Sequence, residues 1–315
     1  MATIYEVAAR AGVSPATVSR VLNGTAVAAD LAERVRSAAA ELDYTPNRSA
    51  RSLRRAHSEL IALVIPDIEN PFFTALARGV EDVAREAGFS VVLCNTDDDL
   101  ARESDYLRVA LAERMAGVVL APASERSDLS GLVAAGRPIV AVDRAPHEHS
   151  VDIVTVDNVA AGRHATEALI ARGARRIACI TGPAGVDTAD GRAEGWRAAL
   201  TEAGLPADES LVVRSDFRQG GGRESMEALL ARGAPVDAAV IANSVMAVGV
   251  ARALRGAGRS LPLAVIGDLP IGFDAPDDLI ALPLPARELG ASAARRLLER
   301  ISGDVEPARS LVLPA

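Results

Sequence analysis

The sequence predicts a multi-domain protein: a small all-α unit at the amino terminus, followed by a two-lobed α/β core of doubly wound parallel sheets. The chain has 315 residues, which is more than one ordinary compact domain needs. Two short helical patterns joined by a glycine open the chain. Beyond residue 58, apolar strand patterns alternate with helical patterns, and the alternation restarts near residue 157.

Charge is distributed unevenly between these parts. Residues 1–58 hold eight arginines and five acidic residues, whereas the rest of the chain holds 26 arginines and 37 acidic residues. A basic head on an acidic body indicates that the head alone meets a polyanion. No apolar run reaches 18 residues and no signal-peptide pattern opens the chain, so we expect a cytoplasmic protein without a membrane span.

The first residues predict two short, capped helices. Thr3 and Glu6 have the spacing of a capping box, and Gly12 is expected to end the first helix. Ser14 is expected to cap the second helix, with Pro15 at its first position. Two short helices joined by a tight glycine turn form a helix-turn-helix.

The second of these helices has a polar outer face. Apolar spacing directs Val18, Val21 and Leu22 inward. The residues left outside are Ala16, Thr17, Ser19, Arg20 and Asn23. Such a face can lie close to the floor of the DNA major groove, with the arginine free to bind a guanine edge. The alternative is an ordinary helical hairpin with a solvated face. A third helix is expected over residues 30–42.

The head resembles a known family. The resemblance lies in "TIYEVAARAGVSPATVSRVLNG" and, further on, "ELDYTPNRSARSL", which are similar to the DNA-binding head of LacI/GalR transcriptional regulators. It implies a helix-turn-helix domain over residues 1–45 and a hinge helix over 46–58, whose Leu53 enters the minor groove of double-stranded operator DNA. Without that head, Leu53 would be taken as the anchor of a linker. The implied DNA-binding residues are Thr3, Ser14, Ala16, Thr17, Ser19, Arg20, Asn23, Asn47, Arg48, Ala50, Arg51, Leu53 and Arg54.

The body alternates strands and helices. Strands are expected at "LIALVIPDI", "FSVVLCNT", "AGVVLAP", "RPIVAVDR", "RRIACITG", "SLVVRS", "AAVIAN" and "LAVIGD". Helices are expected at about 72–87, 101–113, 159–172, 192–203, 222–231 and 245–256. Two such α/β units in tandem predict two lobes, with a ligand cleft at the carboxyl ends of their strands.

The body resembles the core of the same family, which has the type I periplasmic-binding-protein fold. The similar stretches are "NPFF", "VDR", "VDN", "RAEGWRAAL" and "ANSVMAVG". The resemblance implies a core over 59–315, with lobe 1 at about 59–157 plus 285–303 and lobe 2 at about 158–284 plus 304–315. The implied effector-binding residues are Asp67, Phe72, Phe73, Ser124, Asp143, Thr188, Arg192, Phe217, Asn243 and Asp268. For the phenylalanines a core role is the alternative, and for an aspartate after a strand a helix cap.

Two departures from the family pattern concern the effector. Ser244 stands where the family commonly has aspartate after "AN". Leu269 stands where the family commonly has an acid that binds ligand hydroxyls, unless Asp268 substitutes from the preceding position. Both departures weaken the assignment of a simple sugar as effector.

The expected function is therefore that of a transcriptional regulator, commonly a repressor, which binds a palindromic operator as a homodimer and responds to a small-molecule effector. We expect no enzyme activity, cofactor or metal site, because no nucleophile elbow or P-loop is present. Cys94 and Cys179 lie in apolar runs without metal-ligand spacing, and His147 and His149 are expected to be a solvated pair. The alternatives are a solute-binding protein and a sugar-active enzyme on the same α/β fold.

Overall fold

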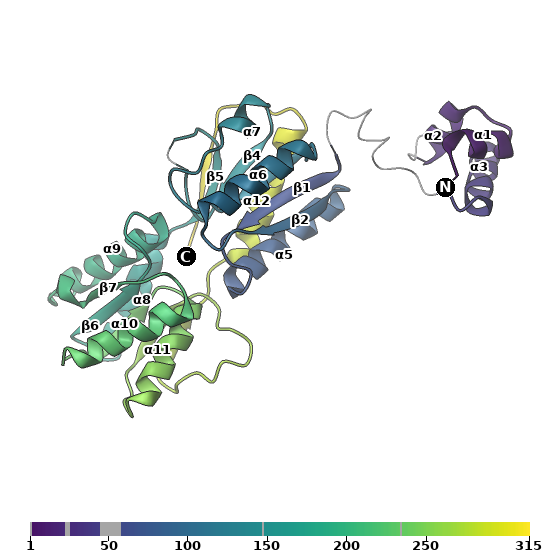
Figure 1. Ribbon diagram of the computed structural model, residues 1–315. Coiled ribbons are helices and arrows are strands. Elements are labelled where there is room, and N and C mark those ends of the chain that lie inside the picture. The colour runs from purple at the N-terminus through teal and green to yellow at the C-terminus, as the bar shows by residue number, and fades with distance from the viewer. Residues whose placement is uncertain (1, 23–25, 45–57, 147, 234) are drawn as a thin grey trace. The chain divides into compact units, whose positions relative to one another are not determined.

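The computed structural model describes residues 2–22, 26–44, 58–146, 148–233 and 235–315 (Figure 1). The chain divides into two compact units, Met1–Ser58 and Glu59–Ala315, which are described separately here. The hinge helix expected over 46–58, with Leu53, lies almost wholly outside the described residues.

The amino-terminal unit contains three helices in its described part. They are α1 (Ile4–Ala11), α2 (Pro15–Leu22) and α3 (Ala29–Glu41). The Thr3–Glu6 capping box is present, and Gly12 ends α1 in the left-handed conformation at φ 64°. The three helices close on a small aliphatic core, in which Val7, Val18 and Val35 are completely buried. This core fixes the turn between α1 and α2.

The first sheet of the larger unit has the strand order β11-β5-β4-β3-β1-β2, and all its pairings are parallel. Its strands are β1 (Leu60–Ile65), β2 (Ser90–Asn95), β3 (Gly117–Leu120), β4 (Ile139–Val142), β5 (Asp152–Val156) and β11 (Ser310–Leu313). Its helices are α5 (Pro71–Glu86), α6 (Leu100–Ala112), α7 (Ser130–Ala134) and α12 (Ala286–Ile301). Alternate β1 residues pack in different clusters: Ile61 and Leu63 with α5 and α12, Ala62 and Val64 with α6 and α7. Both faces of the sheet are therefore covered, as expected for its continuous apolar strands.

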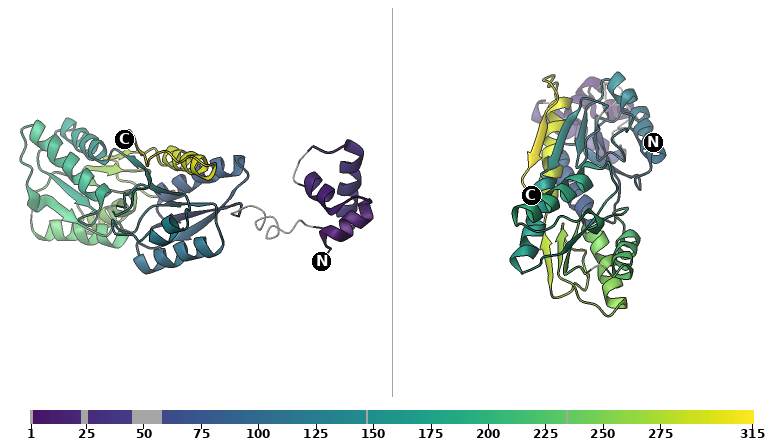
Figure 2. Two further views of the ribbon diagram at one scale, coloured as in Figure 1. Left: turned by 90° about the horizontal axis from the view of Figure 1, so that it is seen from above. Right: turned by 90° about the vertical axis from the view of Figure 1, so that its left-hand side faces the viewer.

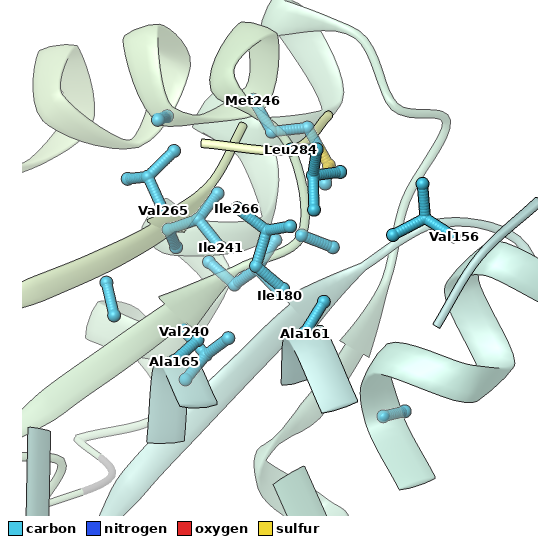
Figure 3. Packing of buried hydrophobic residues seen from close by; sticks show 14 of the residues in the cluster. Val156, Ala161, Ala165, Ile180, Val240, Ile241, Met246, Val265, Ile266 and Leu284 are labelled. Carbon is cyan, nitrogen blue, oxygen red and sulfur yellow. The ribbon is translucent and has the colours of Figure 1, made fainter. Parts of the chain in front are cut away.

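The second sheet has the order β10-β9-β8-β6-β7 and is also parallel in every pairing. Its strands are β6 (Ile177–Thr181), β7 (Val212–Arg214), β8 (Ala238–Ile241), β9 (Leu263–Ile266) and β10 (Leu279–Leu282). Its helices are α8 (Asn158–Ala171), α9 (Asp187–Glu202), α10 (Gln219–Ala231) and α11 (Ser244–Gly256), with a 3₁₀ turn at Glu209–Leu211. Helices α8 and α9 pack together, as do α10 and α11 (Figures 1 and 2). Figure 3 shows how residues from α8, α11 and the strands interdigitate in this core.

The expected multi-domain fold class, with a helical head and a two-lobed core of parallel sheets, is confirmed. One lobe boundary was wrong. We expected residues 304–315 in the second lobe, but β11 pairs with β5 at the edge of the first sheet, with Ser310 opposite Ile153. The physical reason is an ionic anchor: Arg300 at the end of α12 binds Asp152 of β5 and the carbonyl of Pro307, which returns the chain to the first sheet.

Within the described residues, no helix is long and apolar enough to cross a membrane, and no cluster of three or more His, Cys, Asp or Glu residues has the arrangement of a metal site. Cys94 and Cys179 are both buried free thiols.

Candidate ligand-binding cleft

A cleft lies between the two lobes, where the strands of both sheets end. Eight predicted residues line it: Asp67, Phe72, Phe73, Asp143, Thr188, Arg192, Phe217 and Asn243. The sequence reasoning missed the other lining residues: Pro66, Asn70, Asp98, Arg144, Arg218, Ser244, Ile266, Gly267 and Leu284. The cleft combines aromatic rings with a few polar groups, as small-molecule sites do.

Two predicted residues do not line this cleft. Ser124 lies in the loop after β3, where its hydroxyl accepts a hydrogen bond from the Arg126 backbone at 3.2 Å. Asp268 is exposed, and Leu269 packs partly buried against the core. The wall after β9 is made by Ile266 and Gly267 instead, so no carboxylate reaches the cleft from this position.

Three phenylalanines supply the aromatic surface. Phe72 and Phe73 begin α5 and contact each other edge to face, with their ring centroids 5.2 Å apart. Asn70 caps this helix by accepting a hydrogen bond from the Phe72 backbone at 3.1 Å. Phe217 comes from the opposite lobe, and the Arg144 guanidinium lies over its ring, 6.0 Å from the centroid.

Phe217 is held in an uncommon conformation. Its φ is 62°, in the left-handed region that a bulky residue rarely adopts. Its carbonyl accepts a hydrogen bond from the Asn243 amide at 2.9 Å. The ring lies against Gly182, where a Cβ atom would be only 2.1 Å from it. Strained residues of this kind concentrate at functional sites, because the surrounding structure must enforce them.

Asn243 therefore has a structural task in addition to its place in the cleft. Its side-chain oxygen accepts a hydrogen bond from the Met246 backbone at 2.7 Å and caps α11. Its amide nitrogen holds Phe217. Asn243 is thus both the cap of α11 and a part of the cleft lining.

Arg192 is a buried cation on α9. Its Nε donates to the Asn158 side chain at 2.9 Å, and its Nη1 donates to the Ala242 carbonyl at 2.5 Å. Burial lowers the pKa of Arg192 to about 10, and the nearby Asp143 opposes that shift. The guanidinium is therefore charged at neutral pH and held at a fixed orientation.

A close helix crossing places Arg192. A Cβ on Gly162 of α8 would be 2.1 Å from the Arg192 carbonyl oxygen. A Cβ on Gly195 of α9 would be 2.0 Å from the Val159 carbonyl. The absence of side chains at these two positions lets α8 and α9 touch backbone to backbone, which brings Arg192 to the cleft wall.

Asp143 is the buried carboxyl of the first lobe. It follows β4 at φ 65° and is 8% exposed. Burial raises its pKa, while the positive charges of Arg144 and Arg192 act in the opposite direction. It can donate a hydrogen bond when protonated and accept hydrogen bonds when ionised.

Three aspartates and three arginines line the cleft, but they are divided unevenly between the two lobes. Asp67, Asp98, Asp143 and Arg144 belong to the first lobe, whereas Arg192 and Arg218 belong to the second. The first wall is thus net acidic and the second is basic. A polyhydroxylated ligand can donate to one wall and accept from the other, because a hydroxyl does both.

Among the predicted DNA-binding residues of the head, Thr3 caps α1, and Ser14, Ala16, Thr17, Ser19 and Arg20 lie on α2 or just before it. Ala16 and Arg20 are exposed, and Thr17 and Ser19 are partly buried. The Ser14 and Thr17 hydroxyls are 3.0 Å apart, and the Ser14 hydroxyl also accepts from the Thr17 backbone at 3.2 Å. The remaining predicted residues, Asn23, Asn47, Arg48, Ala50, Arg51, Leu53 and Arg54, lie outside the described residues.

A helix-turn-helix in one unit and a two-lobed ligand cleft in the other define a regulator with separate DNA and ligand modules. Family models agree: residues 3–47 match "Bacterial regulatory proteins, lacI family", and residues 58–315 match "Periplasmic binding proteins and sugar binding domain of LacI family". The chain belongs to the LacI family of bacterial transcriptional regulators.

Individual relatives are similar over the whole chain. The HTH-type transcriptional regulator DegA of Bacillus subtilis (strain 168) is 36% identical over 326 residues, which cover 99% of this chain and 95% of DegA. The ribose operon repressor of Escherichia coli (strain K12) is 36% identical over 313 residues, covering 96% and 94% of the two chains. Among solved structures, the lac repressor dimer bound to operator and the anti-inducer ONPF has a TM-score of 0.85 at 26% identity, covering 99% and 96%.

These relatives and the family are transcriptional regulators and not enzymes. We expected His147 and His149 to be a solvated pair. His149 is instead partly buried and accepts a hydrogen bond from the Leu129 backbone at 3.2 Å, and His147 lies outside the described residues.

Proposed function

We propose that this protein is a repressor that binds a palindromic operator as a homodimer and releases or recruits that operator when a small, uncharged polyhydroxylated metabolite occupies the cleft. The observation that supports it most is the cleft itself, with its aromatic rings and opposed acidic and basic walls beside a buried, fixed Arg192. A transcriptional regulator CelR–cellobiose complex, 32% identical with a TM-score of 0.75 over 100% of this chain and 97% of that chain, supports a carbohydrate-like ligand.

The DNA part of the proposal places α2 in the major groove. The exposed Ala16 is small enough to let the helix approach the groove floor closely, and the exposed Arg20 supplies a guanidinium for a base edge. The Ser14 and Thr17 hydroxyls at the start of the helix are suited to phosphate contacts. Leu53 is proposed as the minor-groove wedge, flanked by Arg51 and Arg54.

The dimer part of the proposal uses an apolar surface beside α11, here called the α11 patch: Val245, Val248, Pro270, Ile271 and Phe273. Ile271 is fully exposed, and the charged residues Arg252, Arg255 and Asp274 surround the patch. An apolar centre with a charged rim is typical of a protein interface. A second copy of this chain is the proposed occupant, since a palindrome requires two heads and the similar lac repressor was solved as a dimer.

Selection of bound duplexes from a random pool tests the DNA function. We expect a palindrome to be enriched and to be bound far more tightly than random DNA at moderate salt. A thermal-shift screen with sugars, nucleobases and small acids then identifies effectors, and a stabilising compound should change operator affinity. Equal binding of random and selected duplexes would exclude the repressor assignment.

The wedge has its own test. Leu53→Ala should weaken binding to the selected palindrome more than binding to random duplex, because only the specific complex contains the kinked central step. Arg54→Ala serves as the comparison, since loss of a phosphate contact weakens both kinds of binding. Equal losses for Leu53→Ala on the two duplexes would remove the wedge from the proposal.

A further inference from the structure

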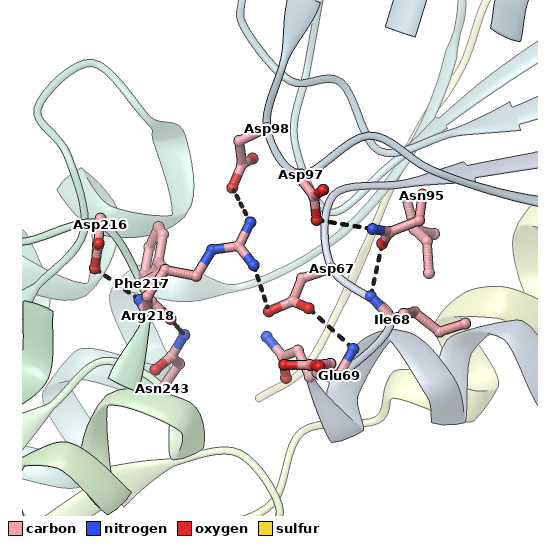
Figure 4. Close-up of polar contacts among 12 residues, drawn as sticks. Asp67, Ile68, Glu69, Asn95, Asp97, Asp98, Asp216, Phe217, Arg218 and Asn243 are labelled. Carbon is pink, nitrogen blue, oxygen red and sulfur yellow. Dashed lines mark hydrogen bonds and ion pairs between the residues drawn. The ribbon is translucent and has the colours of Figure 1, made fainter. Parts of the chain in front are cut away.

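A single arginine of the second lobe binds two carboxylates of the first lobe across the cleft. Arg218, between β7 and α10, has its Nη1 3.3 Å from Asp67 and its Nη2 3.7 Å from Asp98. Figure 4 shows the guanidinium between these two aspartates. The three side chains are 32%, 11% and 32% exposed, so the contacts lie at the mouth of the cleft and not deep inside it.

The backbone on the first-lobe side is fixed by hydrogen bonds that do not involve Arg218. Asp67 accepts a hydrogen bond from the Glu69 backbone at 2.9 Å. The Asn95 side chain accepts from the Ile68 backbone at 2.8 Å and donates to Asp97 at 2.8 Å. Figure 4 shows these contacts beside the ion pairs.

The second-lobe side is fixed in the same way. The Arg218 backbone donates to the Asp216 side chain at 2.8 Å. The preceding Phe217 carbonyl is held by Asn243 at 2.9 Å. Both backbones are held by contacts within their own lobe, so the ion pairs have to order only the side chains when the lobes approach.

Further ion pairs continue from the partners of Arg218 along the first wall of the cleft. Asp98 also binds Arg144 at 2.6 Å, and Arg144 lies 3.6 Å from Asp143. Positive and negative groups therefore alternate along the cleft, and Arg218 is the member of this series that comes from the opposite lobe. If the lobes separated, Asp67 and Asp98 would lose this cation and the first wall would be left with an excess of negative charge.

We propose that Arg218 is an interlobe latch, which uses Asp67 and Asp98 to hold the cleft closed before any effector binds. Its regulatory meaning rests on the proposed function. In a chain with the latch, effector binding has to contribute less free energy to closing the cleft than in a chain without it. The latch therefore sets the balance between the effector-free and effector-bound states. The closure itself does not depend on DNA binding.

Fluorescence energy transfer in the full-length chain tests the latch without DNA or effector. Ser104→Cys on α6 and Glu224→Cys on α10 place one exposed label on each lobe. The native Cys94 and Cys179 are buried, and burial raises the pKa of both thiols, so they react slowly with the label. An excess of unlabelled protein keeps transfer within one chain.

Wild-type protein should be mostly closed at low salt and should open as salt rises, because partly exposed ion pairs are screened. Arg218→Ala should lower the ratio of closed to open molecules by about tenfold at low salt and remove most of the salt dependence. Arg223→Ala is the matched control, since Arg223 pairs with Glu227 on its own helix, and it should behave as wild type.

Asp67→Asn keeps the oxygen that binds the Glu69 backbone but loses the charge. It should also raise the fraction of open molecules. The double variant Asp67→Asn/Arg218→Ala should be little more open than Arg218→Ala alone, because both substitutions remove the same ion pair. If Arg218→Ala has the same energy transfer as wild type at every salt concentration, or if the two single effects add fully, the latch does not exist. Failure of operator selection would instead contradict the proposed function and would leave this measurement valid.

Discussion

At the scale of single residues, the cleft depends on side chains that hold the backbone of their neighbours. Asn243 caps α11 and also binds the carbonyl of Phe217. Gly182 leaves room for the Phe217 ring, and Gly162 leaves room for the backbone of Arg192. The groups that face the cleft are therefore held by capping hydrogen bonds and by close contacts at glycines, which preorganises the site.

Gly182→Ala tests this dependence. Its Cβ would be 2.1 Å from the Phe217 ring, so the ring must move or the backbone must shift, and we expect the free energy of unfolding to fall by about 1–3 kcal/mol in urea denaturation. Gly220→Ala is the control, because no atom lies within 4 Å of that position and the residue is helical. If Gly182→Ala is as stable as this control, the close contact does not constrain Phe217.

Arg20 is the residue-scale test of DNA recognition. Arg20→Ala should lose about 1–3 kcal/mol of discrimination at one base pair of each half-site, because a bidentate arginine contact distinguishes guanine from the other bases. Competition binding with single-base operator variants measures it. A uniform loss of affinity on all the operator variants would show that Arg20 binds only phosphate.

At the scale of elements, Asp152 of β5 joins three segments of the first lobe. Its carboxylate accepts from Arg300 Nε at 2.6 Å and from the Arg309 backbone at 2.9 Å, and Arg296 Nε lies 3.0 Å away. Burial alone would raise the pKa of Asp152, but the hydrogen bonds from Arg300 and Arg309 and the nearby Arg296 guanidinium outweigh it and hold the pKa below its ordinary value. This contact orders the turn into β11.

Asp152→Asn should lower the free energy of unfolding by about 2–4 kcal/mol at neutral pH, because it removes the carboxylate that pairs with Arg300 and one of the carboxylates around Arg296. An aspartate whose pKa is depressed in the folded state stabilises the protein above its unfolded pKa, about 4, and loses that contribution as the pH falls. The difference between wild type and Asp152→Asn should therefore shrink between pH 6 and pH 3. Asp105→Asn, whose exposed partner Arg108 lies on the same helix, should change stability little at either pH.

Helices and strands were more predictable from the sequence than contacts between residues far apart in the chain. The capping box at Thr3, the glycine turn at Gly12 and the amphipathic helices of the head follow from local spacing, and the structure confirms them. The helices α7 and α12 and the strands β5, β10 and β11 were not predicted. For α7, five residues give too little periodicity. Arg218 was missed although the adjacent Phe217 was identified, because its partners lie about 120 and 150 positions earlier in the chain and no local pattern connects them.

At the scale of the whole molecule, the α11 patch is the feature that bears on assembly. Ile271→Asp should prevent dimer formation if a second copy covers the patch, because a carboxylate cannot be buried there without a partner. Analytical ultracentrifugation should then show a monomer with unchanged circular dichroism. Ile68→Asp, at an exposed isoleucine outside the patch, should leave the mass unchanged. A dimer in both variants would place the interface elsewhere.

The sequence by itself determined the helices of the head, most helices and strands of the core, and the resemblance to the family, because caps, turns and apolar periodicity depend on residues close together in the chain. It also indicated eight of the residues that line the cleft, through resemblance. Only the tertiary structure decided that β11 joins the first sheet, that Asp268 faces solvent, and that Arg218 meets Asp67 and Asp98. These facts depend on strand order and on how two lobes face each other, and such long-range contacts leave no signal in local spacing.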